Sequence, residues 1–161
     1  MAPLKETVSI GAPPKLVFGY LADMGRVPEW MPNIVEAERT SEIESGEGAE
    51  LRVVVNAAGR ESSGTSRCVE ADAPHRLVIE STLDMGLTST ITFDLAADGR
   101  RTDLSATVAY AIAGRGFGRL MGNLFGDKLA RRDIAAALAT LKERLEEQQA
   151  KKPSRRRAKT T

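Results

Sequence analysis

Cysteine and histidine are almost missing from this 161-residue sequence, which contains one of each, Cys68 and His75. A single cysteine excludes a disulfide framework and a cysteine-based zinc site. A single histidine excludes a histidine-rich metal centre. The sequence also shows no acidic cluster at metal-ligand spacing, no phosphate-binding glycine loop and no paired nucleophile and base. We therefore expect no metal and no cofactor.

Long apolar runs are also absent. No stretch approaches the roughly 20 residues needed to cross a bilayer, and the N-terminal residues lack the apolar core of a signal peptide. Aromatic residues make up only 4% of the chain, so any pocket must be built mainly from aliphatic and Met side chains. We expect a cytoplasmic protein without a transmembrane segment.

The formal net charge of +1 hides an uneven distribution of charge. Residues 151–161 carry six basic side chains and no acidic one, which leaves the rest of the chain with 17 basic and 22 acidic residues, a net charge of −5. An acidic body argues against a folded surface for nucleic acid. We expect one domain over residues 1–149 and a disordered basic tail over 150–161. The tail could alternatively contact an anionic partner.

Strand patterns cover most of the domain. A strand is expected at residues 6–10, a short helix from Pro14 to about Asp23, and at most one helical turn around Trp30, which lies between Pro28 and Pro32. The later expected strands are 34–41, 51–56, 61–72, 77–83, 88–95 and 102–112, the last two joined by a hairpin at Asp98-Gly99.

A helical pattern covers residues 116–148. Its second half is amphipathic, with one apolar stripe that comprises Ile134, Ala137, Leu138, Leu141 and Leu145. The stripe of the first half is rotated relative to it, which suggests a kink near Gly126. This order of elements predicts an α+β fold in which a curved antiparallel sheet of about seven strands wraps around the C-terminal helix. Because aromatic side chains are so few, we expect a ligand cavity between the sheet and the C-terminal helix.

Several motifs resemble the START-like SRPBCC superfamily, which includes polyketide cyclase/dehydrase-like and lipid-transport proteins. They are Ser9–Phe18, Leu21-Ala22-Asp23, Val27–Pro32, the Gly46–Gly48 turn, the Ala73-Pro74 break and Leu138–Lys142. The resemblance covers about residues 3–149. It implies a helix-grip fold, with a hydrophobic cavity under the C-terminal helix.

The expected cavity determines the candidate ligand-binding residues. Trp30 and Met31 are placed near an entrance, although Trp30 could equally be a hydrophobic plug that holds its short helix on the sheet. The remaining candidates are Val53, Val55, Phe93, Val108, Tyr110, Phe117, Met121 and Leu124.

Three residues are candidates for catalysis. Asp127 and Arg131 fall within the apolar stripe of the helix, so they either border a wet cavity or form an ordinary surface pair. The Tyr110 hydroxyl could orient a ligand or make a structural hydrogen bond. Gly118, Gly122 and Gly126 could form a mobile gate or allow close approach of another backbone, including that of a homodimer partner.

Three functions follow from these features. The first is binding or transport of a small hydrophobic ligand such as a lipid, an isoprenoid or a polyketide-like molecule. The second is a polyketide cyclase or aromatase that works mainly by positioning a reactive chain. The third is a protein-interaction module that uses the glycine stripe and the basic tail.

Overall fold

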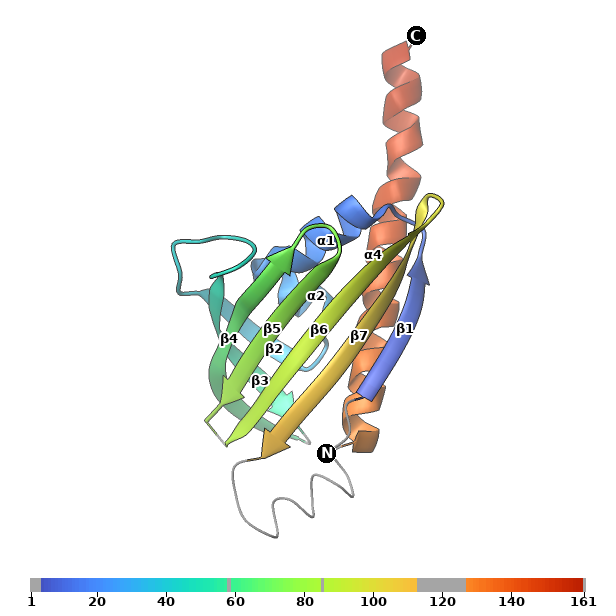
Figure 1. Ribbon diagram of the computed structural model, residues 1–161. Coiled ribbons are helices and arrows are strands. Elements are labelled where there is room, and N and C mark those ends of the chain that lie inside the picture. The colour runs from blue at the N-terminus through green and yellow to red at the C-terminus, as the bar shows by residue number, and fades with distance from the viewer. Residues whose placement is uncertain (1–3, 58, 85, 113–126, 161) are drawn as a thin grey trace.

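One antiparallel sheet of seven strands forms the body of the computed structural model (Figure 1), which describes residues 4–57, 59–84, 86–112 and 127–160. The strands are β1 (Leu4–Ile10), β2 (Ile34–Arg39), β3 (Glu50–Ala57), β4 (Arg60–Asp72), β5 (Arg76–Leu83), β6 (Leu87–Asp98) and β7 (Arg101–Ile112). Their order across the sheet is β1-β7-β6-β5-β4-β3-β2. The predicted strands and the α+β class are confirmed.

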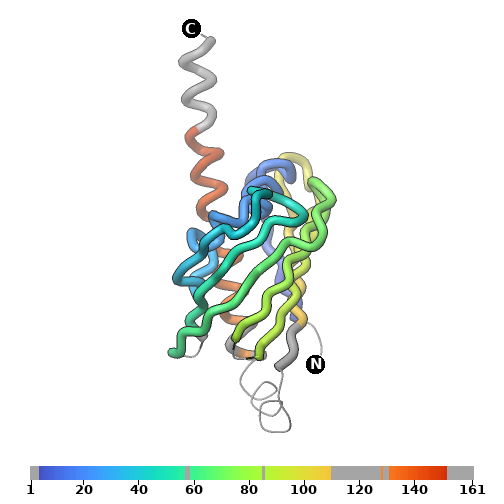
Figure 2. The backbone as a smooth tube through the Cα atoms, turned by 90° about the vertical axis from the view of Figure 1, so that its left-hand side faces the viewer, coloured from blue at the N-terminus to red at the C-terminus, as the bar shows by residue number. Residues whose placement is uncertain are grey.

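The helices lie on the concave face of this sheet, as Figures 1 and 2 show. They are α1 (Pro14–Ala22), the 3-10 turn η1 (Met24–Arg26), α2 (Val27–Trp30) and α4 (Asp127–Thr160). Pro14 occupies the first turn of α1, where its missing N–H costs nothing. No helix in the described ranges is both long and apolar enough to cross a membrane.

The curvature of the sheet has local causes. Register shifts interrupt β2 between Ile34 and Glu36 and β4 between Cys68 and Glu70, and such bulges bend a strand. Gly64 of β4 lies where β5 comes very close. A Cβ atom at Gly64 would be only 2.8 Å from the Leu83 Cα, and nearer still to the Thr82 carbonyl oxygen. Glycine is therefore required at this position.

The core lies between the concave face and the helices. All five residues of the predicted α4 stripe are buried, as expected: Ile134, Ala137, Leu138, Leu141 and Leu145. The backbone of α4 comes closest to β1 and α2. Helix α4 thus packs along the first strand, and the central strands face α1 and α2 as well.

The two ends of α4 bear on the prediction in different ways. The described part of the helix begins at Asp127, so the expected kink, the glycine gate and the candidates Phe117, Met121 and Leu124 lie outside the described residues. At the other end, α4 continues to Thr160 and extends beyond the sheet (Figure 1), where the charge pattern suggested a disordered tail. A helix that is already nucleated by a packed segment can extend residue by residue at little further cost.

Candidate functional site

The innermost part of the concave face is closed by two aromatic rings. Trp30 is 2% exposed and Phe93 is 1% exposed, and their ring centroids lie 6.0 Å apart with an edge-to-face angle of 72°. This arrangement is favourable for aromatic rings. Trp30 is therefore packed as a hydrophobic plug, and its place near an entrance stays a prediction.

The other described candidates for ligand contact also face inward. Met31, Val53, Val55 and Val108 are all buried within the same apolar cluster as Trp30 and Phe93. Tyr110 pairs with Ser89 in the ladder between β7 and β6, but its side chain lies outside the described part of the structure. Alternation thus predicted the inward orientation of the candidates that lie on described strands, and their contact with a ligand stays a prediction.

Inward-facing side chains become more accessible toward the end of the sheet where β6 begins. Phe93 is almost fully buried, but Ile91 and Leu87, which lie on the same face of β6, are only partly buried and still pack against the core. Ile34 at the start of β2 is also partly buried. Apolar side chains on a concave, partly accessible face can contact an apolar ligand.

A polar row interrupts this apolar face. Ser66 of β4, Ser81 of β5 and Ser89 of β6 occupy adjacent inward positions, because Ser66 pairs with Ser81 and Ser81 pairs with Ser89. Ser66 is 7% exposed, and the Ser66 and Ser81 Oγ atoms lie 2.7 Å apart. The sequence analysis missed these three residues, because each of them resembles an ordinary strand serine until the register aligns them.

Two buried polar atoms near the plug have no hydrogen-bond partner among the described residues. They are the indole Nε1 of Trp30 and the side-chain Oδ1 of Asn33, which precedes β2. A buried donor without an acceptor costs about 1–3 kcal/mol, so native proteins seldom retain one without a compensating role. A ligand oxygen or a bound water would satisfy the indole N–H.

Of the expected catalytic pair, the structure describes the side chain of Arg131. Arg131 is 55% exposed, and its Nη1 lies 3.2 Å from Glu6 Oε1 of β1. It therefore forms a surface ion pair across to β1 instead of facing a cavity. The side chain of Asp127 lies outside the described part of the structure, so its role stays a prediction.

Asp133 on α4 is a carboxyl group that the sequence analysis missed. It precedes the buried Ile134 and makes no hydrogen bond or ion pair with a described side chain. Burial raises its pKa above the ordinary value, and the nearby Arg132 lowers it by less. The clue in the sequence was an acidic residue at the border of the apolar stripe, next to a basic one.

Cys68 is fully buried on β4, and burial raises the pKa of its thiol. The thiolate is the reactive form, so Cys68 does not serve as a nucleophile. No group of three His, Cys, Asp or Glu side chains gathers as metal ligands within the described ranges.

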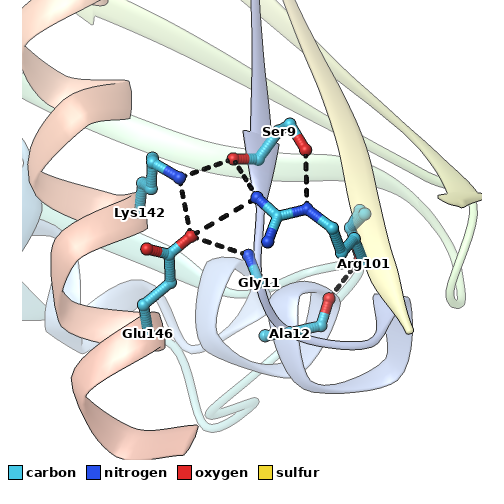
Figure 3. Close-up of polar contacts among 7 residues, drawn as sticks. Ser9, Gly11, Ala12, Arg101, Lys142 and Glu146 are labelled. Atoms are coloured by element: carbon cyan, nitrogen blue, oxygen red, sulfur yellow. Dashed lines mark hydrogen bonds and ion pairs between the residues drawn. The ribbon is translucent and has the colours of Figure 1, made fainter. Parts of the chain in front are cut away.

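Helix α4 is fixed to the sheet by a cluster that we call the α4 latch: Ser9, Gly11, Arg101, Lys142 and Glu146 (Figure 3). Glu146 Oε2 accepts hydrogen bonds from the Gly11 N–H at 2.8 Å and from Lys142 Nζ at 2.7 Å, and lies 3.7 Å from an Arg101 nitrogen. Lys142 and Arg101 also donate to Ser9. The hydrogen bonds from Lys142 and Gly11 lower the pKa of Glu146.

A second polar cluster joins α2 to α4. The Tyr20 hydroxyl donates to Glu29 Oε1 at 3.2 Å, and Arg144 of α4 lies 3.7 Å from the same oxygen. Burial and the Glu29 carboxylate raise the pKa of Tyr20. Arg26 stacks on the Tyr20 ring at 5.3 Å. The two clusters hold α4 against β1 and α2, and so fix the position of the helix over the concave face.

Comparison with solved structures places this architecture in a known group. Protein TTHA0849 from Thermus thermophilus superimposes with a TM-score of 0.76 at 22% identity, over 90% of this chain and 97% of that one. A START superfamily protein from Mycobacterium smegmatis gives 0.75 at 16% identity, over 91% and 99%. The Zhui aromatase/cyclase from Streptomyces sp. R1128 gives 0.73 at 22% identity, over 89% and 93%. At these identities the likeness shows a shared helix-grip fold.

Comparison of sequences gives the family. No curated protein matches the chain significantly. The family described as polyketide cyclase / dehydrase and lipid transport matches residues 1–146, which is nearly the whole expected domain. The chain therefore belongs to the polyketide cyclase/dehydrase and lipid-transport family.

Proposed function

We propose that this protein binds a small hydrophobic ligand between the concave face of the sheet and helix α4. The observation that carries the proposal is the accessible apolar surface beyond the Trp30–Phe93 plug, where Ile91 and Leu87 remain only partly buried on an inward-facing strand. Membership of a family that includes lipid-transport proteins supports it.

The packing of this region also supports a ligand of modest size. Four inward-facing side chains leave little surface accessible to a ligand: Val53, Val55, Phe93 and Val108. Among the described residues of β5–β7, the accessible inward apolar surface therefore lies near Ile91 and Leu87. Contact with that surface would be favourable by roughly 25 cal/mol for each Å² removed from water.

A fluorescence titration with N-phenyl-1-naphthylamine, an uncharged apolar probe, tests the proposal. Replacing Ile91 by Trp fills the accessible region, whereas Thr92→Trp adds a bulky side chain to the opposite face of β6. We expect Ile91→Trp to weaken probe binding by about tenfold or more and Thr92→Trp to leave it nearly unchanged. Absence of probe binding to the unmodified protein, or equal loss in both variants, would refute the site.

Cyclisation of a polyketide is a second candidate function. The half-buried carboxyl of Asp133 is the described candidate for a general acid or base in such a reaction, and burial raises its pKa. The fold shared with an aromatase/cyclase supports this function. Product formation from a poly-β-ketone should then fall in Asp133→Asn with probe binding retained. Equal product yields from the unmodified protein, the variant and buffer would eliminate the proposed activity.

A further inference from the structure

We infer that the ligand carries a neutral oxygen group, a hydroxyl or a carbonyl, that binds to the serine row formed by Ser66, Ser81 and Ser89. The inference rests on the proposed function, since it names the chemical class of molecule that the apolar face would take. It assigns a polar subsite within that face.

Adjacent strands bring the three serines together. In the antiparallel ladder Ser66 is the partner of Ser81, and Ser81 is the partner of Ser89. Paired residues have Cα atoms about 4.5–5.5 Å apart, and their side chains lie on the same face. The inward row is continuous across β4, β5 and β6. On β7 the same row continues at the position of Tyr110.

The row has unused hydrogen-bonding capacity. The hydrogen bond between the Ser66 and Ser81 hydroxyls uses one of their two hydrogens, and the described structure provides no acceptor for the other. Ser89 makes no side-chain hydrogen bond to a described residue. Ser66 is more than nine-tenths buried, so its hydroxyl is largely shielded from solvent. An oxygen atom from a ligand would accept the remaining hydroxyl hydrogens.

The charge of the surroundings selects a neutral group. Within the described ranges, Arg60 is the only Lys or Arg at an inward position of β3–β7, and it is exposed at the hairpin end of β4, about 20 Å along the strand from Ser66. Arg52 and Arg67 lie on the outer face. Burying a carboxylate without a cation is costly, whereas a hydroxyl or carbonyl needs only hydrogen bonds. An alcohol or ketone therefore fits this row better than an acid.

The position of the row defines the length of the apolar part of the ligand. Ser89 lies four residues from Phe93 along β6, a separation of about 13 Å at 3.3 Å per residue. Ile91 lies between them on the same face, next to Ile79 and Val108 in the ladders. A ligand would place an apolar body against this isoleucine–valine band and an oxygen at the serines.

The experiment compares three bicyclic compounds that differ only in their polar group: naphthalene, 2-naphthol and 2-naphthoate. Each displaces N-phenyl-1-naphthylamine from the unmodified protein, from Ser66→Ala, from Ser81→Ala and from the control Ser63→Ala. Ser63 lies on β4 as well, but at an outward position next to Gly64. Thermal unfolding of each variant shows that the fold is retained.

We expect 2-naphthol to bind more tightly than naphthalene, and 2-naphthoate at least about tenfold more weakly than 2-naphthol. Ser66→Ala and Ser81→Ala should each lose about fivefold in 2-naphthol affinity, the value of one neutral hydrogen bond, with naphthalene affinity retained. Ser63→Ala should resemble the unmodified protein. If the probe and naphthalene bind but 2-naphthol shows no preference, or the serine variants lose both ligands equally, the serine row is refuted and the hydrophobic site stands. If neither the probe nor naphthalene binds, the proposed function itself fails.

Discussion

Removing the charge of Glu146 should loosen the α4 latch by a measurable amount. In Glu146→Gln the side chain keeps its shape, but the carboxylate that accepts from Gly11 and Lys142 becomes a neutral amide. Hydrogen bonds to a charged group contribute about 1.5–3 kcal/mol when buried. The Glu146 side chain is 35% exposed and part of its pairing is an ordinary i,i+4 contact, so solvent screening reduces this value.

We therefore expect a loss of about 1 kcal/mol in the free energy of unfolding, or a melting temperature lower by about 2–4 °C for a domain of this size. Urea unfolding at neutral pH measures the loss. Glu147→Gln is the matched control, because Glu147 is an exposed neighbour on α4 that makes no hydrogen bond or ion pair with the described residues. It should change stability by less than about 0.5 kcal/mol.

The pH dependence gives the prediction a sign. The pKa of Glu146 is lower in the folded protein than its ordinary value of 4.5. The contribution of the carboxylate is therefore complete above that value and is lost as the pH falls through the lowered pKa. The stability difference between the unmodified protein and Glu146→Gln should shrink as the pH falls below 4.5. The latch would be refuted if the stability difference between the unmodified protein and Glu146→Gln persisted unchanged in acid. It would also be refuted if Glu146→Gln and Glu147→Gln lost the same stability at neutral pH.

Three further predictions concern packing. Gly64→Ala should destabilise the domain by about 3 kcal/mol or more, because the added methyl group meets the β5 backbone; a urea midpoint close to that of the unmodified protein would contradict this. The Cys68 thiol should react with a disulfide reagent far more slowly in the folded protein than in urea, since it is buried with a raised pKa; equal rates would show that it is accessible. Deleting residues 151–161, most of which belong to the part of α4 beyond the sheet, should shift the melting temperature by only about 1 °C, and a large drop would show that the segment packs on the domain.

Local patterns determined the secondary structure because they are contained within a few consecutive residues. Alternation in the stretch from Leu104 to Val108 and the stripe from Ile134 to Leu145 each identify the face that must leave water, whatever the rest of the chain does. The hairpin at Asp98-Gly99 was confirmed, and Gly99 has the positive φ, 62°, that such a turn requires.

The sequence predicted the orientation of several candidate residues. Val53, Val55, Phe93 and Val108 face inward as alternation required, but alternation does not tell how completely neighbouring elements cover a side chain. Trp30 illustrates the difference. Its position between two prolines left both an entrance and a plug possible, and only the structure shows its contact with Phe93, 63 residues away in the chain.

Contacts between distant residues had no sequence signal at all. The carboxylate of Glu146 reaches the Gly11 amide across 135 residues, and Arg131 pairs with Glu6 across 125. Each of these charged residues had many equally plausible partners in the sequence, so the geometry of α4 on β1 was needed to choose between them.

The sequence by itself determined the class of fold and the inward face of the four strands β3, β5, β6 and β7. Only the tertiary structure aligned Ser66, Ser81 and Ser89 into one row, closed the interior with Trp30 and fixed α4 on β1. The physical reason is that periodicity arises from the local geometry of the backbone, whereas strand register and helix docking depend on how the whole chain packs.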